Sequence, residues 1–284
     1  MGWSAARQTS ILGDKNRSPR PRFTHHLFTR TSMPYAHILL DQQNPIATLT
    51  LNRPDKRNAL SADMMREITH ALRAVGESDA RGLILAAHGP VFSAGHSFAD
   101  MAGQDLDHLR ALFDLCTTMM NTVQALPQPV IAKVHALATA AGCQLVATCD
   151  LALAADSASF AIPGGKASLF CHTPLVAVAR NIGRKRAMEM ALTGDAIDAA
   201  TAAQWGLINH AVPADQLDAA TLDLISRASR GCAVSKAMGK QGYYQQIDLP
   251  QSQAYSVSGE RMAQGAARDE AQQSFSAFLN KRKL

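Results

Sequence analysis

Short apolar runs alternate with amphipathic stretches through the first two thirds of the 284-residue chain, and this rhythm limits the possible folds most strongly. Gly82–Ala87 and Leu151–Ala155 are apolar throughout, and Val130–Val134 is apolar except for Lys133, as strands of a parallel sheet covered on both faces are. Apolar residues at helical spacing follow Ser61, an N-cap candidate, and recur over Leu106–Leu126. The alternation predicts an α/β core with right-handed crossovers.

The flanking regions complete this prediction. His37–Leu40 and Ile46–Leu51 are expected to form two antiparallel strands joined near Asn44-Pro45, and a helix is expected over Cys143–Cys149. After Asp198 the pattern changes to successive helices, expected over Ala199–Trp205, Leu217–Ser229, Ala233–Tyr244, Gln253–Gln264 and Asp269–Leu279. We therefore expect three regions: an extension at 1–33, a core at 34–197 and a helical region at 198–284. The helical region is too long to bury its apolar faces on one sheet, so we expect an oligomer.

The first 33 residues are basic and nearly free of acids. Their cations face only Asp14 and are Arg7, Lys15, Arg17, Arg20, Arg22 and Arg30. One interpretation is a transit peptide, which would place the protein in the mitochondrial matrix. The other, which the prolines favour, is an upstream extension before a domain that begins near Met33, in a cytoplasmic protein. Under either interpretation we expect this segment to be poorly ordered.

Composition excludes several classes of protein. The net charge of +5 comes largely from the basic extension, and the rest of the chain has no basic stripe with aromatic residues, so nucleic acid is not an expected partner. No apolar run approaches the roughly 20 residues of a membrane-spanning helix. The five cysteines are scattered and have no metal-ligand spacing, so we expect reduced thiols and no metal.

Two segments with small residues follow predicted strands. Gly89–Phe98 contains Gly95, which permits a tight turn that exposes the next backbone N–H. Ala140–Gln144 begins a helix, where the first N–H groups have no partner within the helix. Two such donors directed at one oxygen form an oxyanion hole, in which a single donor is worth about 3–4 kcal/mol.

Several motifs together resemble the crotonase, or enoyl-CoA hydratase/isomerase, superfamily. They are Asn52–Ser61, Phe92–Ser97, Ala141–Ala154, Leu192–Asp195, Ala203–Ile208 and Phe278–Arg282. The resemblance extends over about residues 35–284. Two further segments, Phe160–Gly164 and Ser168–Pro174, resemble one particular branch of the superfamily.

The resemblance implies a spiral core of repeated ββα units, a C-terminal helical trimerisation region, and a homotrimer or homohexamer. It implies an acyl-CoA ligand whose thioester oxygen accepts hydrogen bonds from the backbone N–H groups of His96 and Ala141. Ala141 replaces a glycine common in the family, and its N–H remains if the backbone keeps its dihedral angles. No cofactor is implied beyond the coenzyme A of the substrate. The implied coenzyme A contacts are Arg53, Lys56, Arg57, Ala94, Ser97, Phe98 and Lys281.

The chain departs from the family at both glutamates that hydrate an enoyl thioester, because Gln144 and Gly164 stand in their places. Neither residue can transfer a proton, and each acid or base contributes about 10²–10⁴ in rate. Efficient hydration is therefore not expected. His172 is the preferred substitute because histidine titrates near neutral pH. Other candidates in segments expected to line the pocket are His96, Asp100, Asp114, Cys116, Lys166 and Cys171.

Three functions stay open from the sequence. The first is an enzyme that stabilises an enolate or tetrahedral oxyanion of an acyl-CoA, with decarboxylation or thioester hydrolysis as the best-fitting reactions. The second is a slow or unorthodox enoyl-CoA hydratase/isomerase of fatty acid metabolism, in the lyase class. The third is a non-catalytic acyl-CoA-binding oligomer.

Overall fold

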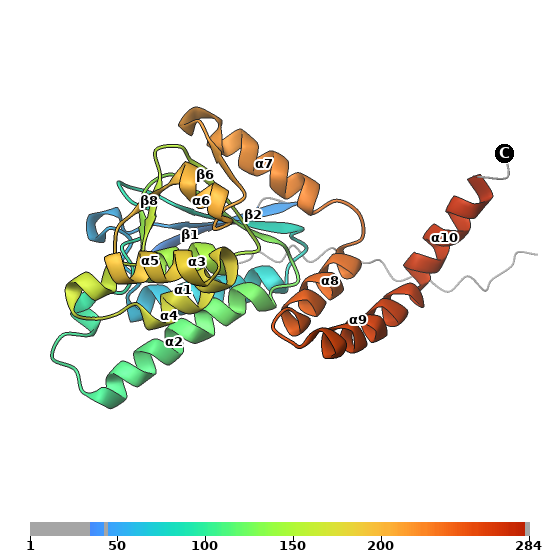
Figure 1. Cartoon of the computed structure of the whole chain (residues 1–284). Coiled ribbons are helices and arrows are strands. Elements are labelled where there is room, and N and C mark those ends of the chain that lie inside the picture. Colours follow the sequence, from blue (N-terminus) through green and yellow to red (C-terminus); the bar gives the residue numbers. More distant parts are fainter. Residues whose placement is uncertain (1–34, 43–44, 282–284) are drawn as a thin grey trace, which may run out of the picture. The chain divides into compact units, whose positions relative to one another are not determined.

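A mostly parallel sheet forms the centre of the computed structural model, which describes residues 35–42 and 45–281 (Figure 1). Within these residues the sheet has six strands in the order β1-β2-β3-β4-β6-β9. Only the β1–β2 pair is antiparallel. The bounds are β1 (Ile38–Asp41), β2 (Ile46–Leu51), β3 (Gly82–Ala87), β4 (Val130–Val134), β6 (Leu151–Ala155) and β9 (His210–Val212).

Side chains of the central strands alternate between two apolar layers, as the period of two in a strand requires. Leu83 and Leu85 of β3 join the larger layer with α1 (Ala62–Gly76) and α2 (Leu106–Ala125). Ile84 and Ala86 of the same strand face α7 (Leu217–Ala228) on the other side of the sheet (Figure 1). Both faces of β3 are therefore buried, which explains its continuous apolar sequence.

A small second sheet precedes and supports the start of the helix α3. It is formed by β5 (Ala138–Thr139), β7 (Ser159–Ala161) and β8 (Ile197–Asp198), with β5 parallel and β8 antiparallel to β7. The helix α3 (Ala141–Thr148) starts directly after β5. The remaining helices before β9 are α4 (His172–Ile182), α5 (Arg184–Thr193) and α6 (Ala199–Trp205).

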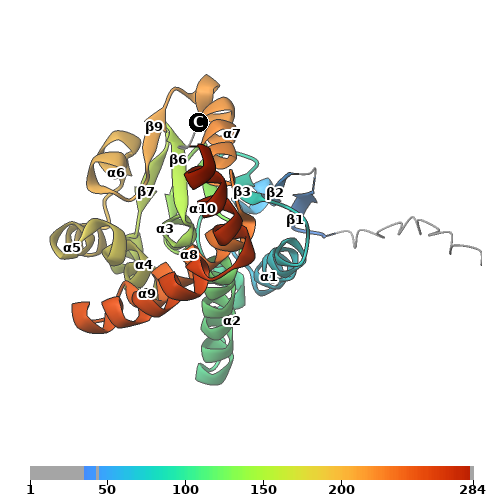
Figure 2. The same cartoon turned by 90° about the vertical axis from the view of Figure 1, so that its right-hand side faces the viewer.

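The chain ends in three helices, α8 (Ala233–Gln246), α9 (Gln251–Ala266) and α10 (Asp269–Lys281) (Figure 2). None of their described residues is fully buried. The large apolar side chains exposed on α9 and α10 are Tyr255, Met262, Phe275, Phe278 and Leu279. These faces agree with the expectation of an oligomer, which stays a prediction.

A buried ion pair anchors α8 to the rest of the fold. Lys240 Nζ lies 2.7 Å from Asp150 Oδ2, and the two side chains are only 9% and 16% exposed. The same carboxylate accepts hydrogen bonds from the Val130 amide and the Tyr244 hydroxyl, while Lys240 also donates to the carbonyls of Val123 and Gln128. Burial lowers the pKa of Lys240, although Asp150 opposes the shift. The network ties α8 to the ends of α2, β4 and β6.

The main sequence-based predictions hold for the fold. The α/β class is confirmed, and Ser61 caps α1 by accepting a hydrogen bond from the Met64 amide. The prediction was wrong for the start of α3, which lies at Ala141 rather than Cys143, and it missed β9, the second sheet, α4 and α5. The expected extension at 1–33 and residue Asn44 of the predicted turn lie outside the described residues. The ββα repeat and the trimerisation region stay predictions.

One further observation concerns membranes. In the part of the chain that the structure describes, no helix combines the length and the apolar character of a bilayer span.

The Lys240→Met substitution should lower the free energy of unfolding by about 3–5 kcal/mol, because it leaves the buried Asp150 carboxylate without its cation. The matched control is Arg66→Met, which breaks the exposed Asp63–Arg66 pair and should cost at most about 1 kcal/mol. Urea unfolding at one fixed protein concentration measures both. Equal losses for the two variants would contradict the anchoring role of Lys240.

Candidate functional site

The loop after β3 is held in place by a buried asparagine. Asn58 is fully buried, and its side chain donates to the carbonyls of His88 and Val91 and accepts from the Arg53 amide. Its own carbonyl accepts from the Ser93 hydroxyl. Asn58 thereby joins the segment before α1 to the loop after β3. The sequence analysis gave Asn58 no role, although a polar residue within the Asn52–Ser61 motif is a signal for a structural hydrogen bond.

Backbone hydrogen bonds also join the segment before α1 to the loop after β3. The Ala94 amide donates to the Arg57 carbonyl at 3.0 Å, and the Leu60 amide donates to the Gly95 carbonyl at 2.7 Å. The Ser97 amide then donates to the Leu60 carbonyl at 3.3 Å. The His96 amide, between these bonded positions, has no acceptor among the described residues.

Gly95 packs directly against the start of α3. A Cβ atom placed on Gly95 would lie 2.7 Å from Ala140 Cβ and 3.0 Å from both the Ala141 nitrogen and the Thr139 oxygen. Gly95 also has a φ of +85°, which residues with a side chain rarely adopt. Only glycine fits this contact without strain, and it brings the His96 and Ala141 amides onto adjoining segments.

Ala141 is the first residue of α3, so its N–H has no partner within the helix. It has no acceptor elsewhere among the described residues either. The sequence analysis placed the conformational demand on Ala141, but the unusual dihedral angles belong to Ala140, with φ 51° and ψ −122°. The Ala140 amide is fixed in this conformation by the Ala161 carbonyl of β7.

The structure brings most of the predicted coenzyme A contacts together. Arg53, Lys56 and Arg57 surround the short 3-10 turn Pro54–Lys56, beside the loop that carries Ala94, Ser97 and Phe98. Lys56 and Arg57 are exposed, whereas one Arg53 nitrogen lies 3.4 Å from the Ser61 hydroxyl. Phe98 is 74% exposed. Lys281 lies at the exposed end of α10, which packs against α9, and nothing among the described contacts brings it to this loop.

Two polar side chains beside the free amides have unsatisfied atoms. Gln144 is 7% exposed, and its Oε1 has no hydrogen-bond partner among the described residues. Neither ring nitrogen of His96 has a partner of normal geometry there, and the ring meets Phe113 of α2 edge-on at 5.2 Å between centroids. Burial lowers the pKa of His96, opposed more weakly by the nearby Leu60 carbonyl and Asp100 carboxylate.

Gly164 has no room for a side chain. A Cβ atom at this position would lie 2.0 Å from the Leu169 carbonyl oxygen and 2.7 Å from Cys171 Sγ. The surrounding segment folds back on itself, because the Leu169 amide donates to the Gly164 carbonyl and the Gly164 amide donates to Cys171 Sγ. The backbone of residues 169–171 therefore occupies the space that a side chain at position 164 would need.

The other candidate acid–base residues are less suited to that role. His172 is exposed at the first position of α4, with its ring tilted against Phe170. Asp100 accepts from the Ala62 amide at the start of α1, and Lys166 pairs with Asp195. Asp114 is exposed on α2.

The thiols in this region are protonated at neutral pH. Burial raises the pKa of Cys116 to about 12 and also raises that of Cys171, where the Gly164 amide opposes the shift. Across residues 35–42 and 45–281, no group of three His, Cys, Asp or Glu side chains could hold a metal ion.

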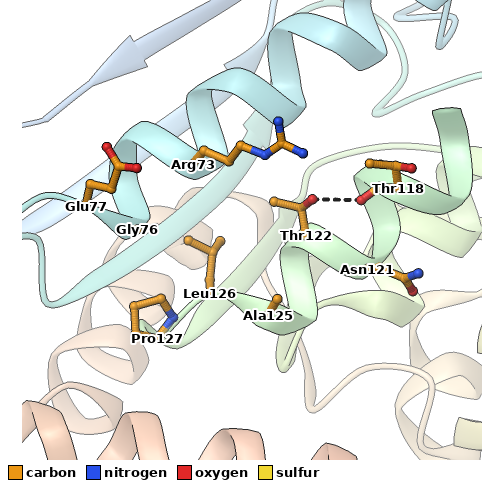
Figure 3. Close-up of a pocket in the computed structure, with 9 residues that line it drawn as sticks. All are labelled: Arg73, Gly76, Glu77, Thr118, Asn121, Thr122, Ala125, Leu126 and Pro127. Atoms are coloured by element: carbon orange, nitrogen blue, oxygen red, sulfur yellow. Dashed lines mark hydrogen bonds between the residues drawn. The ribbon is translucent and has the colours of Figure 1, made fainter.

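One surface pocket lies away from these loops. It has a volume of about 470 Å³ and lies between the end of α1, with Arg73 and Glu77, and the end of α2, with Thr118 and Thr122 (Figure 3). It contacts neither of the segments that carry the free amides. We therefore place the candidate site at the junction of Gly95 and Ala141, where the unpaired donors are.

Comparisons with known proteins identify the family to which the chain is similar. The model of the enoyl-CoA hydratase/isomerase family matches residues 41–284. A mouse protein named enoyl-CoA hydratase domain-containing protein 3, mitochondrial, is 39% identical over 244 residues, which are 85% of this chain and 81% of the mouse protein. The resemblance to one branch carried by Phe160–Gly164 and Ser168–Pro174 is a resemblance to proteins of this name, and it is confirmed.

Solved structures give the same result. The crystal structure of human enoyl coenzyme A hydratase domain-containing protein 3 superposes with a TM-score of 0.83 at 37% identity, covering 86% of this chain and 98% of the human one. An enoyl-CoA hydratase from Mycobacterium smegmatis has the same TM-score at 42% identity, with 86% and 96% covered.

Replacing Gly95 by alanine should separate the two segments. The Gly95→Ala change meets both a positive φ and atoms at 2.7–3.0 Å, whereas Gly103→Ala meets a positive φ of 74° with no atom within 4 Å. Overpacking costs roughly 1–3 kcal/mol beyond the conformational penalty. Gly95→Ala should therefore lower the free energy of unfolding by at least about 1 kcal/mol more than Gly103→Ala, measured by urea unfolding. Similar losses would show that the contact is loose.

Proposed function

The chain belongs to the enoyl-CoA hydratase/isomerase family, and we propose that it binds an acyl-CoA thioester and stabilises an oxyanion on it without hydrating a double bond. The observation that carries the proposal is the pair of unpaired amides at His96 and Ala141, on segments held together by Gly95. Backbone N–H groups at a turn and at a helix start are suited to binding negative charge as it develops on a carbonyl oxygen.

The space around Gly164 argues against the hydratase reaction. Hydration by the usual route requires two carboxylates, and Gln144 supplies an amide at one position. At the other, the Leu169 carbonyl oxygen lies where a side chain would start. We therefore expect the site to differ from that of a hydratase in the backbone around Gly164 as well as in two residue types.

Decarboxylation and thioester hydrolysis remain the reactions that fit best. In decarboxylation, the electron pair of the broken C–C bond moves into a thioester enolate while carbon dioxide leaves, so bond cleavage requires no base. The enolate oxygen would then accept from the two amides, and the α-carbon afterwards takes a proton. Hydrolysis requires a base to activate water, and His172, exposed at the start of α4, is the candidate for it.

A non-catalytic acyl-CoA-binding oligomer is the second candidate function. It is favoured because, among the described residues of this region, the Cys116 and Cys171 thiols are protonated and Asp100 accepts a hydrogen bond at the start of α1, which leaves the exposed His172 as the candidate base. The exposed apolar faces of α9 and α10 support assembly into a homotrimer or homohexamer in either case. The slow or unorthodox hydratase/isomerase of fatty acid metabolism is the third candidate, and its support is the name shared by the relatives.

The mitochondrial alternative for the location gains support from the mouse relative, whose name includes the word mitochondrial. The basic, acid-poor composition of residues 1–33 agrees with it. The cytoplasmic location preferred from the sequence stays a prediction.

A thioester should bind more tightly than its thioether analogue if the two amides contact the carbonyl oxygen. We expect butyryl-CoA to bind about tenfold or more tightly than S-butyl-CoA by calorimetry, since two hydrogen bonds contribute about 1 kcal/mol each. Ala141→Pro removes one donor at the first helical position, which tolerates proline, and should reduce the ratio. Ala233→Pro, at the corresponding position of α8, is the control and should keep it. Equal affinities in the unsubstituted protein would contradict the oxyanion hole.

Crotonyl-CoA should be hydrated at least about 100-fold more slowly than by a family member with both glutamates, because one acid–base group alone is worth about that much. Loss of the absorbance of the conjugated thioester measures this reaction. Gln144→Glu should not restore the rate, because Gly164 cannot be given a second carboxylate without moving residues 169–171. Turnover near the rate of a two-glutamate enzyme would instead favour the hydratase alternative.

A further inference from the structure

A second pocket lies between the end of α2 and the C-terminal helices α8 and α9, which Figure 2 shows beside one another. It has a volume of about 380 Å³, which is within the usual range for small-molecule sites. Its polar lining consists of amide side chains, one tyrosine and one cation: Asn121, Gln124, Gln241, Tyr244, Gln245 and Arg261. A polar cavity with a single cation suits a small anion better than an apolar ligand.

Arg261 uses one edge of its guanidinium group within the protein and leaves the other edge unpaired. Its Nε and Nη2 atoms both donate to Gln245 Oε1, at 2.9 and 2.7 Å. Among the described residues, the edge formed by Nη1 and Nη2 has no acceptor, and Arg261 belongs to no ion pair. Two parallel N–H groups on one guanidinium edge match the two oxygens of a carboxylate.

A glycine in α8 makes room for the Arg261 side chain. Gly242 lies inside the helix, where glycine is less favourable than alanine. A Cβ atom at this position would lie 2.9 Å from Arg261 Cδ and 3.7 Å from its Nε. The side chain of Arg261 therefore lies directly against the backbone of α8. Gln245 follows Gly242 by three residues and lies on the same face of the helix, so the two residues together position the guanidinium at the cavity.

The acidic groups nearest to the cavity already have partners. The Tyr244 hydroxyl donates to Asp150 Oδ1 at 2.9 Å, and this carboxylate pairs with Lys240 at 2.7 Å. Glu260, the neighbour of Arg261 in the chain, accepts a hydrogen bond from the Gln264 amide. The charge of Arg261 is therefore left for a ligand.

Three amide side chains of the lining are also left for a ligand. Asn121, Gln124 and Gln241 form no side-chain hydrogen bond within residues 35–42 and 45–281. Each amide can both donate and accept, so these side chains suit a second polar group on the same molecule.

We propose that this cavity, the Arg261 cavity, binds a small carboxylate whose remainder carries a polar group. The carboxylate accepts hydrogen bonds from the Nη1–Nη2 edge of Arg261, and the polar group bonds to the amide side chains of the lining. The proposal does not depend on the proposed function, because the cavity shares no lining residue with the segments that carry the free amides. A ligand in this position contacts α2, α8 and α9 at once, so it stabilises the packing of the C-terminal helices.

Calorimetry on the full chain compares succinamate with succinamide, which carries a neutral amide in place of the carboxylate. We expect succinamate to bind with a dissociation constant of about 1 mM or lower. It should bind at least about tenfold more tightly than succinamide, because hydrogen bonds between two charged groups are the stronger ones. No binding of succinamate, equal affinities for the two compounds, or tighter binding of inorganic phosphate than of succinamate would overturn the proposal.

Two substitutions test the role of the guanidinium. Arg261→Gln removes the cation, and Gln245→Glu keeps the shape of the side chain but gives Arg261 a carboxylate from within the protein. Each should weaken the binding of succinamate at least about tenfold. Binding that survives both substitutions would show that the cavity is not the site.

Two glycines of α8 provide a matched pair. Gly242→Ala should displace Arg261 and weaken succinamate binding, whereas Gly239→Ala meets no atom within 4 Å and should leave the affinity unchanged. Alanine favours the helix at both positions, so a loss confined to Gly242→Ala cannot come from unfolding of α8. Equal affinities for the two variants would contradict the assigned position of Arg261.

Light scattering distinguishes a free ligand from a carboxylate of a second copy of the chain. We expect Arg261→Gln to keep the molecular mass of the unsubstituted protein at the same concentration. A smaller assembly would show that a second copy occupies the cavity, and it would overturn the assignment to a small molecule.

Discussion

The contact between Gly95 and the first turn of α3 is the constraint on which the rest of the site depends. It requires a residue with no side chain and a positive φ at the end of one loop, and it presses that loop against the Ala140–Ala141 backbone. Because the contact is made by backbone atoms and the Ala140 Cβ atom, it places the two amides on adjoining segments without a polar side chain. The hydrogen bonds of Asn58 hold the loop to the segment before α1.

The two positions at which the resemblance implies hydratase glutamates, Gln144 and Gly164, differ in how much room they leave for a longer side chain. The Gln144 side chain has the same length and shape as a glutamate and differs only in carrying an amide in place of the carboxylate. This difference requires no change in the backbone of α3. At Gly164, the Leu169 carbonyl and Cys171 Sγ occupy the space of a Cβ atom, and the Gly164 amide and carbonyl both bond within this segment. A glutamate there would require a different path for residues 169–171. A side chain at position 164 is therefore incompatible with the present path of the backbone.

Features of the fold and of the site that depend on local sequence could be predicted, whereas features that depend on contacts between distant segments could not. β3, β4 and β6 were predicted with their observed bounds because both of their faces are buried, which leaves an apolar signal that only Lys133 of β4 interrupts. The two- and three-residue strands of the second sheet are too short to show a period. The free amides were predicted from glycine and helix-start patterns, but the strain at Ala140 and the filled space at Gly164 depend on contacts between distant segments. No local pattern encodes those contacts.

The electrostatics of the site favour a ligand that develops negative charge. Among the described residues near the two amides, Asp100 is bonded to the start of α1, the thiols of Cys116 and Cys171 are protonated, and His96 is uncharged. A pair of carboxylates beside the same amides would repel an enolate or a tetrahedral oxyanion and would have to be offset by proton transfer. Here the fixed dipoles of two N–H groups and of α3 lie among protonated thiols and an uncharged imidazole, in surroundings where burial strengthens them. These surroundings suit the proposed enolate or tetrahedral chemistry, because fixed dipoles stabilise a developing negative charge without a proton transfer.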